Sequence, residues 1–388
     1  MNTRFNPVFS DRPQSIFPTM SALARKHQAI NLGQGFPDEG APNSVLSIAA
    51  QSILDGDNQY APVEGIPELR EAIAADNKRF YDLDINPQTE ALVVGGATVG
   101  LAAAFLGFLN PGDEAIVLSP FYECYAPQIE AAGAKVVCVQ LEPPDWRLRR
   151  AALDKAISSK TKLIVINSPH NPLGKVMDEA ELQVVADCAM ANDLIVVCDE
   201  VYEHLLFDDR RHRPLMTLPG MFERCVRIGS AGKTFSVTGL RVGYVTGPEH
   251  LITALLKAHQ HLAYTVPIPL QKAVAKGLAL GDDYYHEFRR GMEARRDLLA
   301  AGLESAGFAV LPCAGSYFLT VDIRSVGRED DRAFCEEITE HAGVAAVPLS
   351  AFRHPSESDP PRYFSRFCFC KRLEVLEQAS DRLKAYLA

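Results

Sequence analysis

The run Leu194-Ile195-Val196-Val197-Cys198-Asp199 consists of consecutive apolar residues followed by a carboxylate. A continuous apolar run rich in β-branched residues predicts a strand that is buried on both faces, as in the middle of a parallel sheet. Asp199 would stand at the mouth of this strand, where a carboxylate needs a cationic or protonated partner because isolated burial would neutralise it. A helix N-cap is the alternative role for Asp199, since Glu200 and Tyr202 follow.

The sequence around this run alternates short β-branched segments with helical ones. Further strands are expected at 91–94, 115–118, 135–141, 163–167, 225–229 and 241–246, and helices at 98–109, 125–132, 148–158 and 178–191. Strands that alternate with helices indicate crossover units. We therefore expect an α/β fold with a mostly parallel, doubly wound sheet.

The pattern changes after about Pro248. Long helices are expected at 251–263 and 284–305, short strands at 316–322 and 365–370, and helices at 331–342 and 373–387. This order suggests a small α+β domain. The first 40 or so residues are interrupted by Pro and Gly, which predicts an extended arm that lies against another part of the chain. The expected divisions are an arm and small-domain segment at 1–45, a large domain at 46–275 and a small C-terminal domain at 276–388.

The composition excludes several classes of protein. The chain has 388 residues, of which 47% are hydrophobic and 23% charged, and its formal net charge is −10. A negative surface repels phosphodiester backbones, so nucleic acid is not an expected partner. No apolar run is long enough for a membrane span, and the polar N-terminus lacks the core of a signal peptide. Nine scattered cysteines without a CxxC motif favour reduced thiols in the cytoplasm.

Lys233 lies in the segment Gly229-Ser-Ala-Gly-Lys-Thr234, directly after a predicted strand. The segment resembles a P-loop, but that pattern requires a glycine where Arg227 stands, which excludes a nucleoside triphosphatase. A lysine among small residues can be made nucleophilic by desolvation and can form a Schiff base. A solvated surface charge is the commoner role of a single lysine, but the apolar strand before Lys233 argues against it.

Other polar groups also follow predicted strands, where ligands bind in open parallel sheets. Thr98 begins a helix after Gly95-Gly96, and the amides of a helix N-terminus can seat a phosphate. The absence of GxGxxG disfavours a nicotinamide enzyme. Arg241 and Arg366 can pair with phosphate or carboxylate, although Arg366 could instead stack on an aromatic ring. The turn at 167–172 would hold an amide over the sheet edge, with a structural Asx-turn as the alternative.

Two other kinds of catalytic site are not expected. His259 and His261 are two residues apart on a predicted helix and face different sides, and Cys368 and Cys370 lack a second pair of ligands. No metal site is therefore predicted. The GxSxG motif of a serine nucleophile is absent.

Together these motifs resemble the fold type I, pyridoxal-phosphate-dependent aminotransferases of class I and II over nearly the whole chain. The matching motifs are Asn-x-Pro-x-Asn-Pro at 167–172, Asp-Glu-Val-Tyr-Glu at 199–203, Ser-x-x-Lys at 230–233, Arg241, and Arg-Phe-Cys-Phe at 366–369. Longer strings at 31–38, 121–127 and 229–239 look like the branch that contains kynurenine/glutamine transaminase K and bacterial methionine aminotransferase.

The resemblance implies pyridoxal 5'-phosphate as the cofactor and a catalytic role for three residues. Lys233 would hold the cofactor covalently and transfer the proton during the reaction. Asp199 would pair with the ring nitrogen and keep it protonated, so that the ring can withdraw electrons. Tyr202 and Asn171 would bind the phenolic oxygen of the ring, and Tyr122 would stack on the ring.

The resemblance also implies groups that bind the phosphate and the substrate. The phosphate would be held by the amides of Ala97 and Thr98 and by the side chains of Ser230 and Arg241. The substrate carboxylate would be held by Arg366, Asn171 and the backbone of Gly35. Tyr60 would reach the cofactor from the partner subunit, which implies a homodimer with shared active sites.

The expected walls of the substrate pocket are apolar and aromatic: Phe36, Tyr60, Tyr125, Ile16 and Phe352. Such walls suit methionine, glutamine, phenylalanine or kynurenine better than a dicarboxylate. The expected activity is a transaminase that moves the α-amino group of such donors to a 2-oxo acid by a ping-pong mechanism.

Three alternatives remain for this chain. N-succinyldiaminopimelate aminotransferases have similar motifs, and a basic residue at the distal end of the pocket would favour that activity. Cysteine-S-conjugate β-elimination is a side activity that the same chemistry allows. A non-catalytic binding protein of the same fold is disfavoured because Lys233, Asp199 and Arg366 are all present.

Overall fold

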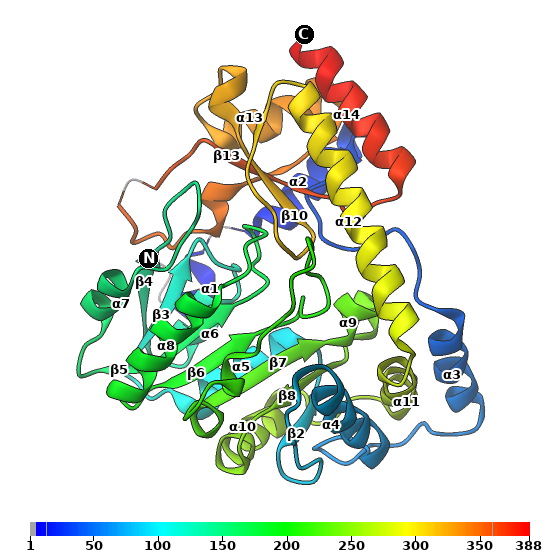
Figure 1. Cartoon of the computed structure of the whole chain (residues 1–388), viewed down its shortest axis with the longest axis vertical. Helices are drawn as coiled ribbons and strands as arrows, with labels where there is room; N and C mark the ends of the chain where they lie inside the picture. The colour runs from blue at the N-terminus through cyan, green and yellow to red at the C-terminus, as the bar shows by residue number, and fades with distance from the viewer. Residues whose placement is uncertain (1–4, 13, 359) are drawn as a thin grey trace.

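A central sheet organises the computed structural model, which describes residues 5–12, 14–358 and 360–388. The sheet has seven strands in the order β2-β8-β7-β6-β5-β3-β4 (Figure 1). These strands are β2 (Ala91–Val94), β3 (Glu114–Ser119), β4 (Lys135–Gln140), β5 (Thr161–Asn167), β6 (Ile195–Asp199), β7 (Cys225–Ser230) and β8 (Gly243–Thr246). Strand β8 is antiparallel to β2 and β7, and the other pairs are parallel. The mostly parallel sheet that the sequence predicted is thus confirmed.

Helices cover both faces of this sheet, because its strands are apolar on both sides. Successive residues of a strand point to opposite faces. Leu163 and Val165 of β5 accordingly join one hydrophobic core, and Ile164 and Ile166 join another. The surrounding helices are α4 (Pro67–Tyr81), α5 (Ala97–Phe108), α6 (Tyr125–Ala131), α7 (Arg150–Ala156), α8 (Glu179–Ala191), α10 (Glu249–Leu262) and α11 (Ile268–Leu278).

A smaller antiparallel sheet has the order β12-β13-β10-β9. Its strands are β9 (Ala309–Val310), β10 (Phe318–Asp322), β12 (Val347–Pro348) and β13 (Phe364–Cys368). The long helix α12 (Asp282–Ser305) runs from α11 up to this sheet and packs beside α14 (Leu373–Leu387) (Figure 1). The helix expected at 331–342 consists of α13 (Asp331–Glu337) and a π-helical turn η5 (Ile338–Ala342). The predicted domain border at residue 275 falls inside α11.

The N-terminal arm is more helical than the sequence suggested. The expectation of an extended arm is wrong for α1 (Pro7–Ser10) and α2 (Ile16–Lys26). The hydroxyl of Ser15 accepts from the backbone N–H of Phe17 and caps α2, and Pro18 lies in the first turn, where a missing N–H costs little. Beyond α2, β1 (Ile30–Asn31) pairs in parallel with β11 (Val344–Ala345). A further helix, α3 (Asn43–Leu54), packs against α11.

A buried ion network supports the turn after β6. The guanidinium of Arg227 on β7 donates to Glu200 and Glu203, and all three side chains are at most 3% exposed. Tyr81 and Tyr244 also donate to Glu203, at 2.7 and 2.9 Å. Burial alone would raise the pKa of Glu203, but the Arg227 cation outweighs it and brings this pKa to about 2. Arg227, which excluded a P-loop, therefore holds the turn that follows Asp199.

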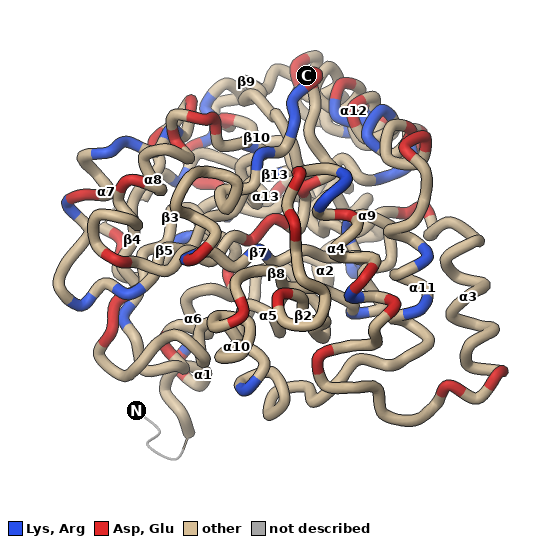
Figure 2. Tube along the Cα trace, turned by 60° about the horizontal axis from the view of Figure 1, so that its bottom comes forward, with Lys and Arg blue, Asp and Glu red and all other residues tan. Residues whose placement is uncertain are grey.

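Charges of both signs are interleaved along the chain, for example on α12 (Figure 2). No helix among the described residues is both long and apolar enough to cross a membrane. The nine cysteines are free thiols.

Candidate active site

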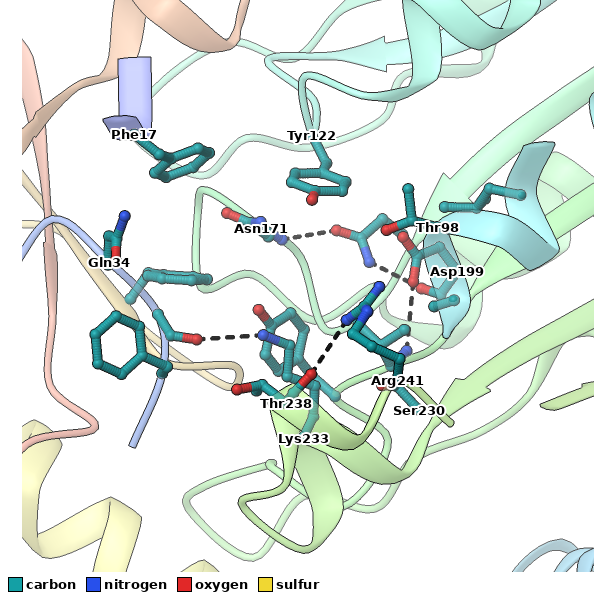
Figure 3. Close-up of a pocket in the computed structure, with 18 of the residues that line it drawn as sticks. Phe17, Gln34, Thr98, Tyr122, Asn171, Asp199, Ser230, Lys233, Thr238 and Arg241 are labelled. Carbon is teal, nitrogen blue, oxygen red and sulfur yellow. Dashed lines mark hydrogen bonds between the residues drawn. The ribbon is translucent and has the colours of Figure 1, made fainter. Parts of the chain in front are cut away.

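A cavity of about 290 Å³ lies where the carboxyl ends of β5, β6 and β7 meet the smaller sheet (Figure 3). The predicted site residues come together here, apart from Tyr60 and Tyr125. Its lining consists of Phe17, Gln34, Gly35, Phe36, Ala97, Thr98, Leu101, Tyr122, Asn167, Asn171, Asp199, Val201, Tyr202, Ser230, Lys233, Thr238, Arg241, Phe318 and Arg366. The cavity thus has the position that parallel sheets give to their ligands.

Asp199 ends β6 as a buried carboxylate that faces the cavity. It accepts hydrogen bonds from the Tyr125 hydroxyl and from the backbone N–H of Val201. No cationic side chain within the described chain forms an ion pair with it. Burial raises the pKa of Asp199 to about 6, against the hydrogen bonds and the nearby Lys233 cation, which favour its charged form. A carboxylate in this position is stabilised by a protonated nitrogen, which is the group that a pyridinium ring supplies.

Lys233 lies in the short helix α9 (Ala231–Thr234), directly after β7. Its Nζ donates to the carbonyl of Gly35 at 3.2 Å and lies 5.5 Å from the centre of the Tyr202 ring. Burial lowers the pKa of Lys233 below its usual range. A partly desolvated amine loses its proton more readily and so becomes nucleophilic. A solvated surface lysine, the alternative that the apolar strand before Lys233 argued against, does not fit this position.

The N-terminus of α5 provides a seat for an anion. Its first residues, Ala97 and Thr98, line the cavity. Within the described parts of the chain no side chain caps this helix, and its first turn contains no acidic residue. Gly96 precedes the helix with φ +85°, and a Cβ there would meet the Arg241 guanidinium at 2.6 Å. The glycine therefore lets Arg241 approach the free amides. Arg241, Ser230 and the helix N-terminus together fit a phosphate group.

Arg366 on β13 is a completely buried cation at the other end of the cavity. It donates to Asn171 Oδ1 at 2.8 Å and to the carbonyl of Gly33 at 2.5 Å. Its Nε has no hydrogen-bond partner, and among the residues that the structure describes no carboxylate pairs with it. Burial lowers the pKa of Arg366 to about 10. A buried, uncompensated cation with a free N–H is a site for a carboxylate.

Three aromatic rings surround the Arg366 guanidinium. Its Cζ lies 3.9 Å from the centre of the Phe318 ring, 4.8 Å from that of Phe352 and 5.2 Å from that of Phe17. Contacts between cations and rings stabilise a desolvated guanidinium and fix its plane. Stacking on aromatic rings was the alternative to carboxylate binding for Arg366. The two occur together here, because the rings contact the guanidinium while its Nε–H has no hydrogen-bond partner among the described residues.

Tyr125 and Tyr60 do not line the cavity. Tyr125 was expected as a wall of the substrate pocket, but it is 2% exposed and its hydroxyl donates to Asp199 instead. Tyr125 is the first residue of α6, and its ring belongs to the hydrophobic core. Tyr60 is 80% exposed and packs edge-on against Tyr264. The expected wall residue Ile16 also lies outside this cavity, where its neighbour Phe17 takes the place.

Sequence reasoning missed several lining residues: Phe17, Gln34, Leu101, Val201, Thr238 and Phe318. Gln34 and Thr238 belong to strings that supported the family resemblance, so their motifs were a usable signal. Phe318 had no such signal, because it meets Arg366 through the pairing of β10 with β13. Asn167 was recognised as part of a motif, and its side-chain N–H donates to the backbone carbonyl of Asp199 at 2.8 Å.

The buried charge of Asp199 has a measurable effect on stability. Because its folded-state pKa is raised, ionisation favours unfolding, and the penalty grows as the pH rises from about 4 through 6. In cofactor-free protein, we expect Asp199→Asn to increase the free energy of unfolding by at most about 3 kcal/mol at pH 8, and by about half of that at pH 5. Urea unfolding at both pH values tests this. A less stable cofactor-free variant at pH 8 would contradict it.

The sequence matches the model of the family "Aminotransferase class I and II" over residues 27–383. It is 45% identical over 377 residues, 95% of each chain, to a Mycobacterium tuberculosis protein named "Probable N-succinyldiaminopimelate aminotransferase". It is also 38% identical to methionine aminotransferase of Escherichia coli, over 98% of this chain and 99% of that one.

Comparison with a solved structure also shows similarity to an aminotransferase. The structure of N-succinyldiaminopimelate aminotransferase from Mycobacterium tuberculosis superposes with a TM-score of 0.96 at 44% sequence identity, and covers 99% of this chain and 100% of that one. The family match spans both sheets and every residue that lines the cavity except Phe17. The chain belongs to the class I and II aminotransferases and is a transaminase that depends on pyridoxal 5'-phosphate.

Proposed function

We propose that Lys233, Asp199 and Tyr202 are the catalytic residues of this transaminase. When bound, the cofactor supplies an aldehyde that exchanges amines and a ring that withdraws electrons. Asp199 would keep the ring nitrogen protonated, and its burial with no ion-pair partner among the described residues supports this role. Lys233 Nζ would hold the cofactor until the amine of the donor displaces it. The released Nζ would then remove the proton from Cα of the donor and later deliver one to the 2-carbon of the oxo acid. Tyr202 and Asn171 orient the ring oxygen.

The remaining lining residues would bind the two charged ends of the ligands. Ser230, Arg241 and the amides of Ala97 and Thr98 hold the phosphate, and Tyr122 stacks on the ring. Arg366 binds the α-carboxylate of the donor through its free edge, while Asn171 and the backbone at Gly33 fix its orientation. Lys233 lines the same cavity as both sets of groups (Figure 3). This shared lining supports a ligand held at both termini, with its reacting carbon beside Nζ.

Replacing the proposed nucleophile tests the assignment. Lys233→Ala is expected to lose the absorbance band of the lysine-bound cofactor and to lower kcat by at least about a thousandfold, because no other amine replaces Nζ. Absorbance spectra and single-turnover rates measure both effects. Lys257→Ala, on the exposed side of α10, is the control and should change neither. Normal turnover by Lys233→Ala would refute the assignment.

We also propose that the enzyme is a homodimer in which Tyr60 completes the partner's site. Tyr60 does not line the cavity of its own chain, yet it is exposed together with Leu54 and Tyr264, which are 80% and 50% exposed. Exposed apolar side chains of this size are typical of an interface. A symmetric dimer would bury them and bring Tyr60 to the second active site.

Mixing two inactive variants tests the shared site. Lys233→Ala and Tyr60→Ala should each have low activity, because each lacks a residue of the site. Co-expressed, they form mixed dimers in which one of the two sites receives Lys233 from one subunit and Tyr60 from the other. We expect recovery of about a quarter of the wild-type activity. Sedimentation gives the assembly size, and a monomer, or no recovery in confirmed mixed dimers, would contradict the proposal.

The donor class that the cavity supports best is an amino acid with an uncharged, largely apolar side chain, such as methionine, phenylalanine, glutamine or kynurenine. The observation that carries this is the lining: Phe17, Phe36, Tyr122, Leu101 and Phe318 surround the space, and its cations are Lys233, Arg241 and Arg366. Each of these cations already has a proposed role. A second carboxylate on a short donor would thus be buried without a partner.

A second candidate is N-succinyldiaminopimelate. The 45% identity to a protein named for that activity favours it. This donor is long and ends in carboxylates, so it requires cationic groups beyond the apolar cavity.

A donor panel with one 2-oxo acid distinguishes these candidates. We expect kcat/KM for methionine, phenylalanine, glutamine or kynurenine to exceed that for aspartate by about a hundredfold, since the side-chain carboxylate of aspartate would be desolvated without a partner. Half-reactions followed by absorbance provide the measurement, and N-succinyldiaminopimelate is included as a further donor. Equal use of aspartate would disprove the preference for uncharged side chains.

A further inference from the structure

A second cavity, of about 610 Å³, lies next to the active site. It is formed by residues 12 and 14–16 around the start of α2, residues 121–127 after β3, Arg332 in α13, and residues 350–357, 360 and 362. None of the roles proposed above uses it. Its volume is within the usual range of ligand pockets, about 300–1,000 Å³.

A single layer of side chains separates the two cavities. Phe17 lines the first cavity and Ile16 the second, and Tyr122 lines the first while Phe121 lines the second. Phe352 lines the second cavity, but its ring contacts Arg366 and lies 5.8 Å from the ring of Phe17. Ile16 and Phe17 are only half-buried. These two side chains are therefore the part of the separating layer that a long ligand would have to pass.

The lining of the second cavity carries more positive than negative charge. Its cations are Arg12, Arg332, Arg353 and Arg362, and its carboxylates are Glu123 and Glu357. Arg12 pairs with Glu130, which lies outside the lining. Arg332 and Arg362 have no carboxylate within ion-pair distance in the described parts of the chain. Within the described lining, these two guanidinium groups have no paired carboxylate and can bind an anion.

Part of the lining of this cavity is a buried ion pair that includes Arg353. Its side chain is 3% exposed and pairs with Glu357, which is equally buried, at 3.1 Å. Glu357 also accepts from the Ser119 hydroxyl and from the backbone N–H of His354, both at 2.7 Å. The Nε of Arg353 has no hydrogen-bond partner among the residues that the structure describes. Glu357 is therefore fully used, while the arginine retains an unpaired N–H in a desolvated wall.

We propose that the second cavity is the distal subsite for donors that carry a carboxylate at the end of a long acyl chain, and that Arg332 and Arg362 bind this carboxylate. The inference rests on the proposed active site and extends its donor range. The cavity of 290 Å³ holds the cofactor and the α-amino acid end. The chain passes Ile16 and Phe17 into the second cavity. Short uncharged donors occupy only the first cavity, so one enzyme accepts both classes.

Two exposed arginines can be replaced without disturbing the core. With N-succinyldiaminopimelate as the donor, Arg332→Ala and Arg362→Ala are each expected to raise KM by about tenfold to a hundredfold, because one charge-assisted contact is lost. The value of kcat should stay within about twofold, since the contact is far from the reacting carbon and acts equally before and during the reaction. With methionine, both parameters should stay within about twofold.

Arg290→Ala on α12 is the matched control, because it removes an exposed arginine that does not line either cavity. This variant should leave kcat and KM unchanged for both N-succinyldiaminopimelate and methionine. Three outcomes would overturn the inference: no turnover of N-succinyldiaminopimelate by the natural chain, an unchanged KM for this donor in both variants, or an equal loss with both donors. Failure of methionine and the other uncharged donors would instead refute the proposed donor class, while a selective change in KM for the acidic donor would still support the distal subsite.

Discussion

The active site depends on two buried charges that form no ion pair within the described residues. Neither Asp199 in the parallel sheet nor Arg366 in the antiparallel sheet has an oppositely charged side chain within ion-pair distance in this part of the chain, although both are buried. Burying an unpaired charge is unfavourable, so the fold must hold each one by other contacts. Hydrogen bonds from Tyr125 and Val201 stabilise Asp199, and aromatic rings surround Arg366. The cofactor and the substrate supply the missing opposite charges.

Arg227 is a third buried charge, and unlike Asp199 and Arg366 it is paired within the protein. It is equally buried, but Glu200 and Glu203 compensate its charge, and two tyrosines donate to Glu203. Such a closed network stabilises the turn after β6 and leaves nothing for a ligand to bind. Lying directly behind Asp199, it fixes the backbone from which this carboxylate points into the cavity.

Two sheets of different architecture must meet to form the site. The parallel sheet contributes Asp199, Lys233 and the seat at α5, since its strands end at one edge. The antiparallel sheet contributes Phe318 and Arg366, which lie on neighbouring strands β10 and β13. The arm before β1 adds Phe17 and closes the space above Arg366. The same arm borders the second cavity, so it separates the reacting end of a donor from its distal end.

The sequence by itself determined the parallel sheet, the position of Asp199 after its central strand and the segment around Lys233, because apolar periodicity and local motifs are properties of neighbouring residues. Ser15 and Pro18 also carry a local signal for the start of α2, a capping hydroxyl and a proline in the first turn. Tertiary structure alone decided that the Tyr125 hydroxyl donates to Asp199 and that the rings of Phe17 and Phe318 contact Arg366. It also decided that a second cavity, lined by arginines, lies on the other side of Phe352. These contacts join segments far apart in the chain, and the direction of each side chain is set by packing, which no local pattern encodes.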